Sequence, residues 1–139
     1  MNGRVFADTN IIVYAHTSSE KDKQTKVVEI LDNANLIIST QVVKEFISVM
    51  VRKFGQPIKK IKAQIDAVIS IAGVVNEDLE LIDSAIEIHQ MYKYRFYDCL
   101  IVAAALRANC DILLSEDMQH GQVVEGTLKI VNPFAPANG

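Results

Sequence analysis

The segment RVFADTN, residues 4–10, sets the pattern of this chain: a short apolar run that ends in polar residues. The run Arg4–Ala7 predicts a short buried strand, and Asp8, Thr9 and Asn10 mark its end. Four later segments have the same character and are also predicted as strands: 36–38, 73–75, 111–114 and 128–131. Strands that are apolar throughout are typical of a parallel sheet covered on both faces.

The segments between these strands repeat apolar residues every three or four positions, which predicts helices. The expected helices cover residues 11–15 (a short helix or turn), 21–34, 41–54, 57–72, 78–92 and 97–108. The last is rich in alanine and apolar on most sides, so we expect it to be the buried central helix. Alternating strands and helices predict an α/β fold, a three-layer α/β/α sandwich with a central, mostly parallel sheet of about five strands.

With 139 residues, half of them apolar, the chain has the size of one globular domain. We expect this domain to span residues 1–132 and the remaining residues, 133–139, to form a short flexible C-terminal tail. The longest apolar run, Cys99–Leu106, is too short to span a bilayer. The N-terminus has no apolar signal segment, so a cytoplasmic protein with no membrane association is expected.

The net charge of −3 argues against a protein that binds nucleic acid through overall positive charge, but the charge is segregated. Residues 52–62 contain five basic and no acidic side chains. Such a run is either a solvated helix face or an edge that contacts the phosphates of RNA. The basic residues in question are Arg52, Lys53, Lys59, Lys60 and Lys62.

Four acidic residues are expected at one edge of the predicted sheet. Asp8 directly follows the first strand, and Asp117 follows the fourth strand by three residues. Glu45 lies early in the helix after the second strand, with mostly apolar neighbours, and Asp98 lies in the first turn of the central helix. In open α/β sheets, ligands bind outside the carboxyl ends of the strands, so these four carboxylates can converge there.

Each acid also has an ordinary explanation, as a helix cap, a first-turn residue or a surface glutamate. Together, at one sheet edge, they favour a functional site. Clustered carboxylates repel one another unless a cation neutralises them, and oxygen ligands favour Mg²⁺ or Mn²⁺. Such an ion promotes phosphodiester hydrolysis. The sequence therefore predicts that Asp8, Glu45, Asp98 and Asp117 bind metal and catalyse this reaction.

Four segments resemble, in order and spacing, the signature segments of the PIN domain family. They are VFADTN (5–10), STQVVKE (39–45), YDCLIVAAA (97–105) and ILLSEDM (112–118). The resemblance implies a PIN-like fold and a Mg²⁺- or Mn²⁺-dependent ribonuclease that acts on RNA. A stand-alone domain of this length is most similar to VapC-type toxins of toxin–antitoxin pairs.

The resemblance also assigns roles to individual residues. It implies that Asp8, Glu45, Asp98 and Asp117 are the metal-binding and catalytic acids. It further implies that Asn10 shapes the pocket and that Ser115 orients the last acid, Asp117. The resemblance further implies a homodimer and a small antitoxin protein that occludes the site. Some family members carry a further acid after the fourth, whereas Met118 and Gln119 stand here, so the number of metal ions stays open.

Two other functions are compatible with parts of this pattern. One is a catalytically silent PIN-like module that binds nucleic acid, against which the presence of all four acids counts. The other is a phosphoacceptor receiver domain, which also places acids at the ends of parallel strands. A receiver needs an adjacent pair of acids after the first strand, and Thr9 and Asn10 follow Asp8 here.

Overall fold

The structure, a computed structural model, describes residues 3–136. Its centre is a six-stranded sheet in the order β3-β2-β1-β4-β6-β5. The strands are β1 (Arg4–Ala7), β2 (Asn35–Ser39), β3 (Gly73–Val75), β4 (Ile112–Leu114), β5 (Val123–Val124) and β6 (Leu128–Val131). All neighbouring strands pair in parallel except β5 and β6, which are antiparallel. The predicted mostly parallel sheet is confirmed.

The strand β5 was not predicted from the sequence. It consists of Val123 and Val124 only and lies at the edge of the sheet, where Val123 is half exposed. Two residues are too few to show the alternation that identifies a strand. The sheet therefore has one more strand than the five expected.

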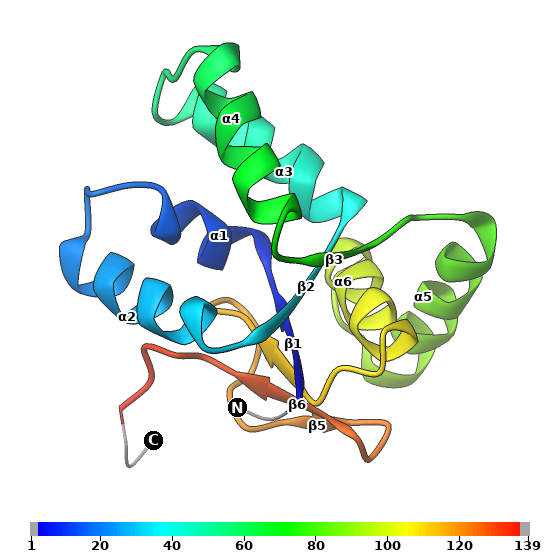
Figure 1. The fold of residues 1–139 in the computed structure, drawn as a ribbon. Coiled ribbons are helices and arrows are strands. Elements are labelled where there is room, and N and C mark those ends of the chain that lie inside the picture. Colours follow the sequence, from blue (N-terminus) through cyan, green and yellow to red (C-terminus); the bar gives the residue numbers. More distant parts are fainter. Residues whose placement is uncertain (1–2, 137–139) are drawn as a thin grey trace.

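Helices cover both faces of the sheet, which confirms the three-layer sandwich. The helices are α1 (Thr9–Ala15), α2 (Lys21–Asp32), α3 (Thr40–Arg52), α4 (Ile58–Ile69), α5 (Leu79–Tyr92) and α6 (Phe96–Arg107). Helices α1 and α2 lie on one side of the sheet, and α5 and α6 lie on the other (Figure 1). In α6, residues 99–105 are all buried, as expected for the central helix.

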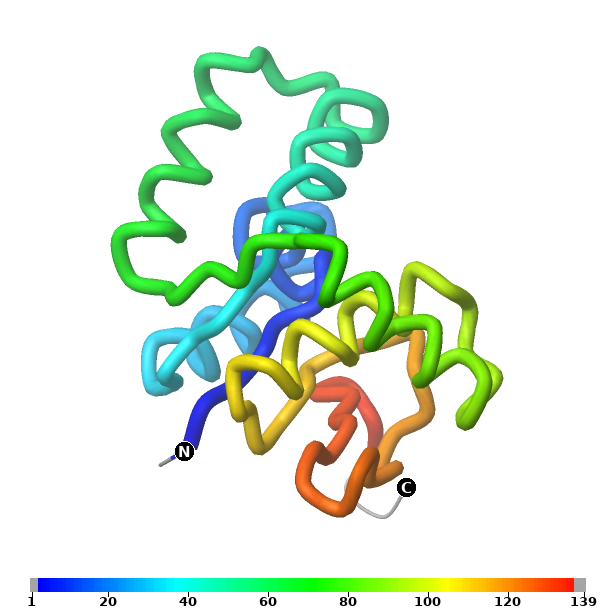
Figure 2. Tube along the Cα trace, turned by 90° about the vertical axis from the view of Figure 1, so that its right-hand side faces the viewer, coloured from blue at the N-terminus to red at the C-terminus, as the bar shows by residue number. Residues whose placement is uncertain are grey.

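Helices α3 and α4 form a hairpin that projects beyond the carboxyl edge of the sheet (Figure 2). The hydroxyl of Ser39 accepts a hydrogen bond from the backbone N–H of Val42 and so caps the start of α3. Gly55, with φ of +60°, turns the chain between the helices in a conformation that favours glycine. Pro57 is the N-cap residue of α4. The helix therefore begins at Ile58, one residue after the start predicted from the sequence.

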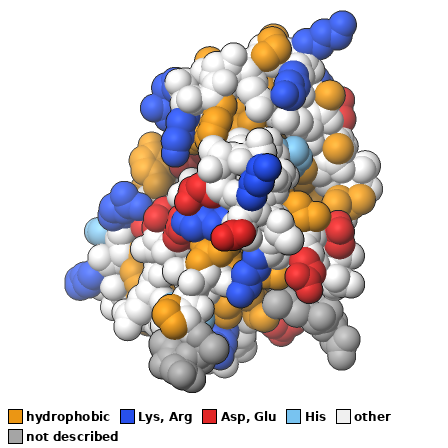
Figure 3. Space-filling view, turned by 90° about the vertical axis from the view of Figure 1, so that its left-hand side faces the viewer, with side chains coloured by type: hydrophobic (Ala, Val, Ile, Leu, Met, Phe, Trp, Pro, Cys, Tyr) orange, Lys and Arg blue, Asp and Glu red, His pale blue; other side chains and the backbone are white. Residues whose placement is uncertain are grey.

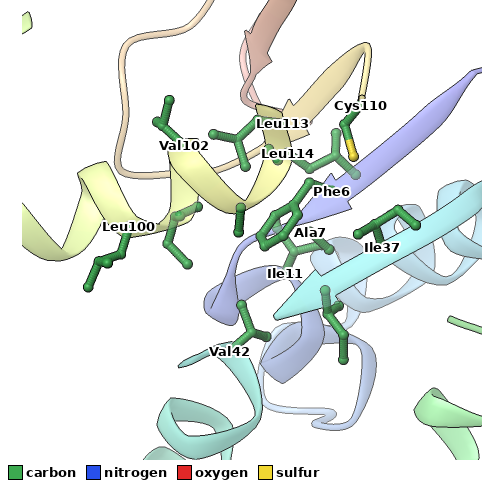
Figure 4. Packing of buried hydrophobic residues seen from close by; sticks show 14 of the residues in the cluster. Phe6, Ala7, Ile11, Ile37, Val42, Leu100, Val102, Cys110, Leu113 and Leu114 are labelled. Carbon is green, nitrogen blue, oxygen red and sulfur yellow. The ribbon is translucent and has the colours of Figure 1, made fainter. Parts of the chain in front are cut away.

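The core lies between the sheet and the two helical layers. The ring of Phe6 packs near Leu113 and Leu114 of β4, and Val102 of α6 comes from one side (Figure 4). Phe6 and Leu113 are completely buried. Close packing on both faces holds the central strands in place. The residues that directly follow β1 and β4 are therefore held in place as well.

The C-terminal segment packs on the domain up to the end of the described residues. Pro133 is buried, and the ring of Phe134 meets that of Tyr14 edge-on with 5.3 Å between the ring centroids. The sequence did not predict this contact, and residues 137–139 of the expected tail lie outside the described residues. The domain boundary at residue 132 stays a prediction. Within residues 3–136, every helix is too short or too polar to cross a membrane.

Candidate active site

A cleft of about 480 Å³ opens at the carboxyl edge of the sheet, between α1, α3 and the start of α6. Its lining includes all four acids expected from the sequence, which are Asp8, Glu45, Asp98 and Asp117. They come from the ends of β1 and β4 and from α3 and α6. The structure therefore brings these carboxylates together, while their catalytic and metal-binding roles stay predictions.

Asp8 lines the cleft and caps α1. Its Oδ1 accepts a hydrogen bond from the backbone N–H of Thr9 over 2.7 Å, and its Oδ2 accepts one from the hydroxyl of Ser115 over 3.0 Å. Burial raises the pKa of Asp8 to about 6, although both hydrogen bonds oppose this rise. The negative charges of Asp98 and Glu45 raise the pKa further.

The structure corrects the expected partner of Ser115. Its hydroxyl was expected to orient Asp117, but it donates to Asp8 and accepts a hydrogen bond from the backbone N–H of Met118. Asp117 is held instead by Asn10, whose Nδ2 donates to Oδ2 of Asp117 over 3.0 Å. Asn10 thus lines the cleft and binds the fourth acid, and its pocket-shaping role stays a prediction.

Glu45 is exposed at the cleft wall, whereas its apolar helical neighbours had suggested that it borders packed surface. Its position is nevertheless defined by two donors to Oε1, each at 3.1 Å: the hydroxyl of Thr9 and Nε2 of Gln41. The same Nε2 donates to the backbone carbonyl of Tyr97 over 3.2 Å. Gln41 thus links α3 to the first turn of α6.

The cleft lining also includes Thr9, Gln41 and Arg95, which were not predicted as site residues from the sequence. The side chain of Arg95 is 80% exposed, and its Nε donates to Oδ2 of Asp98 over 3.2 Å. The three-residue spacing of Arg95 and Asp98 and the four-residue spacing of Gln41 and Glu45 were the available signals, because such pairs are neighbours on a helix.

The basic run of residues 52–62 is divided by the structure. Arg52 lines the cleft, with its Nε bound to the hydroxyl of Ser48. The four lysines lie outside the cleft lining, on the hairpin of α3 and α4, where Lys62 pairs with Asp66. Figure 3 shows Lys and Arg side chains over the upper part of one face, where Figure 1 places this hairpin.

Glu116 lies between two site residues in sequence but is outside the cleft lining. Its carboxylate accepts hydrogen bonds from the hydroxyl of Tyr14 over 2.6 Å and from Nζ of Lys23 over 2.5 Å. Burial raises its pKa, but the hydrogen bonds from Lys23 and Tyr14 outweigh this effect and lower the pKa overall. Both oxygens of the Glu116 carboxylate therefore accept hydrogen bonds from residues outside the cleft lining.

The chemistry of the cleft fits a hard divalent cation. Its acidic groups are all carboxylates, and the raised pKa of Asp8 reflects, after burial, the negative charge of its neighbours. Within residues 3–136, however, no three His, Cys, Asp or Glu side chains are arranged to hold an ion as they lie. The expectation of four acids converging on one point is thus corrected to four acids that line one cleft.

A sequence model described as PIN domain matches residues 5–125 of the chain. The chain belongs to the PIN domain family. This membership removes the receiver-domain alternative, because the match covers the segments that hold all four acids. No curated protein matches the chain at the level of sequence.

Solved structures share this PIN fold at low sequence identity. VapC20 of Mycobacterium tuberculosis, described as a toxin that cleaves the sarcin–ricin loop, has a TM-score of 0.67 at 16% identity, covering 81% of this chain and 91% of VapC20. A toxin–antitoxin complex from Klebsiella pneumoniae has a TM-score of 0.67 at 20% identity, with coverages of 94% and 98%. VapBC2 of Rickettsia felis, bound to a promoter DNA fragment, has a TM-score of 0.65 at 17% identity, with coverages of 92% and 98%.

Proposed function

We propose that this PIN domain is a Mg²⁺- or Mn²⁺-dependent endoribonuclease that hydrolyses phosphodiester bonds in RNA and acts as the toxin of a toxin–antitoxin pair. The observation that carries the proposal is the cleft in which the half-buried Asp8 lies beside Asp98 and Glu45, with the pKa of Asp8 raised to about 6. A carboxylate in such surroundings stays ionised at neutral pH most readily when a cation is bound nearby.

The four acids Asp8, Glu45, Asp98 and Asp117 would hold the metal. When bound, Mg²⁺ or Mn²⁺ supplies an activated water and offsets the charge that develops on the phosphate. Thr9 and Ser115 keep the Asp8 carboxylate in one orientation through the hydrogen bonds that it accepts. Two residues that are not metal ligands thus orient the Asp8 carboxylate for metal binding.

The other polar residues of the cleft have positioning and substrate-binding roles in this proposal. Asn10 holds Asp117, while Thr9 and Gln41 hold Glu45. The guanidinium of Arg52 lies on the cleft wall and binds a phosphate of the RNA strand. Farther along the strand, RNA phosphates contact the lysines of the hairpin, Lys53, Lys59, Lys60 and Lys62.

The proposal includes a small antitoxin protein that blocks the site and a homodimer of the toxin. It is supported by two structural neighbours, one described as a toxin–antitoxin complex and the other as VapBC2 bound to promoter DNA. The homodimer is proposed because the chain resembles VapC-type toxins. The enzyme would act in the cytoplasm, where RNA and the antitoxin are made.

Cleavage of RNA by the purified chain tests the proposal. A labelled single-stranded RNA is incubated with wild type, Asp8→Asn and Asp83→Asn in Mn²⁺ or in EDTA. Asp83 is an exposed acid on α5, so Asp83→Asn controls for loss of one negative charge. We expect cleavage by wild type and Asp83→Asn in Mn²⁺ only, and none by Asp8→Asn. If wild type binds the RNA and leaves it intact in Mn²⁺, the catalytically silent module is the correct alternative.

A further inference from the structure

The loop after β4 carries two residues of the cleft and one residue that faces away from it. Ser115 binds Asp8, and Asp117 is bound by Asn10. Between them, Glu116 turns to the opposite side and accepts hydrogen bonds from Tyr14 of α1 and Lys23 of α2. One short loop is thus held from both sides.

The partners of Glu116 are themselves firmly placed. Nζ of Lys23 lies 3.3 Å from the hydroxyl of Tyr14, and it sits over two aromatic rings, 4.8 Å from the centroid of Tyr14 and 5.0 Å from that of Phe134. The side chains of Lys23 and Glu116 are only 29% and 24% exposed. An ion pair shielded in this way is screened less by solvent than one on an open surface.

The geometry of the loop makes this cluster relevant to the cleft. The hydroxyl of Ser115 accepts a hydrogen bond from the N–H of Met118 while it donates to Asp8. The bend of residues 115–118 therefore sets where both Ser115 and Asp117 lie. Glu116 is the residue through which α1 and α2 hold this bend from outside.

We propose that the cluster of Tyr14, Lys23 and Glu116 positions the loop 115–118, and that Glu116 acts on the metal site as a positioning residue and not as a ligand. The statement about metal rests on the proposed function; the statement about the loop does not. In this arrangement, loss of the contact between Lys23 and Glu116 leaves Glu116 held by Tyr14 only, as far as the described residues show. The loop is then held less firmly, and Ser115 and Asp117 are placed less precisely in the cleft.

Manganese binding distinguishes a positioning residue from a ligand. Mn²⁺ is titrated calorimetrically into metal-free wild type, Glu116→Gln, Lys23→Met and the double variant. We expect each single variant to bind Mn²⁺ about tenfold more weakly, as is typical when a residue behind a metal ligand is lost. The double variant is expected to bind no more weakly than the weaker single variant, because both changes remove the same contact. Lys26→Met, an exposed lysine on the same helix, is the matched control.

If Glu116 were a ligand, Glu116→Gln would weaken Mn²⁺ binding while Lys23→Met would leave it unchanged or tighten it. That pattern would overturn the proposal.

Hydrogen exchange of the Met118 amide tests the positioning of the loop without metal. We expect this exchange to be at least about fivefold faster in Glu116→Gln and in Lys23→Met than in wild type or Lys26→Met, because freeing the loop exposes its hydrogen bonds. Unchanged exchange overturns the proposal. If exchange is faster but wild type binds no Mn²⁺, the proposed enzymatic function fails and the positioning role stands.

Discussion

The hydroxyl of Ser115 donates a hydrogen bond to Oδ2 of Asp8 over 3.0 Å, although 107 residues separate the two in the chain. The parallel pairing of β1 with β4 makes this contact possible, and the backbone N–H of Asp8 also donates to the carbonyl of Leu114. The fold thus supplies Asp8 with one donor, the Ser115 hydroxyl, and one acceptor, the Leu114 carbonyl, and the orientation of the Asp8 carboxylate depends on the sheet.

Replacement of Ser115 should weaken metal binding without removing an acid. Ser115→Ala leaves Oδ2 of Asp8 without its hydroxyl donor, so the carboxylate is less well oriented and its pKa rises further. We expect the affinity for Mn²⁺ to fall about tenfold, and Ser115→Thr, which keeps the hydroxyl, to lose less. Calorimetric titration measures both. Equal affinities for Ser115→Ala and wild type would show that the hydroxyl has no part in the site.

Neutralisation of Asp8 should stabilise the metal-free protein at neutral pH. Burial raises the pKa of Asp8 from 3.8 to about 6. The folded state therefore holds this proton more tightly than the unfolded state, so its contribution to stability is fully present below about pH 4 and is lost as the pH rises through about 6.

The Asp8→Asn variant has no charge to bury at this position. We therefore expect its free energy of unfolding at pH 7.5 to exceed that of wild type by about 3 kcal/mol. At about pH 4 the two proteins should be similar. Urea denaturation in EDTA measures the difference. A variant that is less stable than wild type at pH 7.5 contradicts the assigned surroundings of Asp8.

Gln41 should affect turnover more than RNA binding. Its Nε2 bridges Glu45 and the carbonyl of Tyr97, so Gln41→Met leaves Glu45 with Thr9 as its remaining donor. We expect kcat to fall about tenfold, a loss of roughly 1.4 kcal/mol, while KM changes little. Steady-state cleavage of a short RNA measures both, with Gln90→Met, an exposed glutamine of α5, as control. A rise in KM at constant kcat would instead assign Gln41 to substrate binding.

The basic residues should contribute unequally to RNA binding. Arg52 lines the cleft, whereas Lys59 and Lys60 are exposed on α4 outside it, and Lys62 pairs with Asp66. We expect Arg52→Ala to weaken RNA binding severalfold and to lower the slope of log affinity against log salt by about 1. Lys62→Ala should have the smallest effect. Fluorescence anisotropy with catalytically inactive Asp8→Asn as background measures these affinities, and equal effects for all basic residues would mean that the cleft does not direct the strand.

Much of the fold was predictable because its signals are local. The apolar runs around Val5, Ile37 and Leu113 show where strands lie, and the spacing of Phe46 and Met50 shows a buried helix face. The placement of the four acids in one cleft could be predicted from the parallel sheet. It depends on the direction of the strands more than on the packing of individual side chains. The two-residue strand β5 had no comparable signal.

The hydrogen-bond partners within the site were not predictable, because they depend on how distant elements pack. The sequence associated Ser115 with Asp117, its near neighbour, whereas the pairing of β1 with β4 brings Ser115 to Asp8. In the sequence the basic residues form one run, whereas the turn at Gly55 separates Arg52 and Lys53 at the end of α3 from the three lysines of α4. The sequence also did not predict where the Glu116 side chain points, because this depends on the positions of α1 and α2.

The central claim is that the carboxylates of the cleft bind the metal ion on which RNA cleavage depends. Its most direct test measures Mn²⁺ affinity and the Mn²⁺ concentration that half-activates RNA cleavage in the same metal-free preparation, for wild type and Asp98→Asn. We predict that the two values agree for wild type and that Asp98→Asn loses both binding and cleavage. Cleavage that persists in EDTA, or Mn²⁺ binding that survives in Asp98→Asn with unchanged affinity, would contradict the claim.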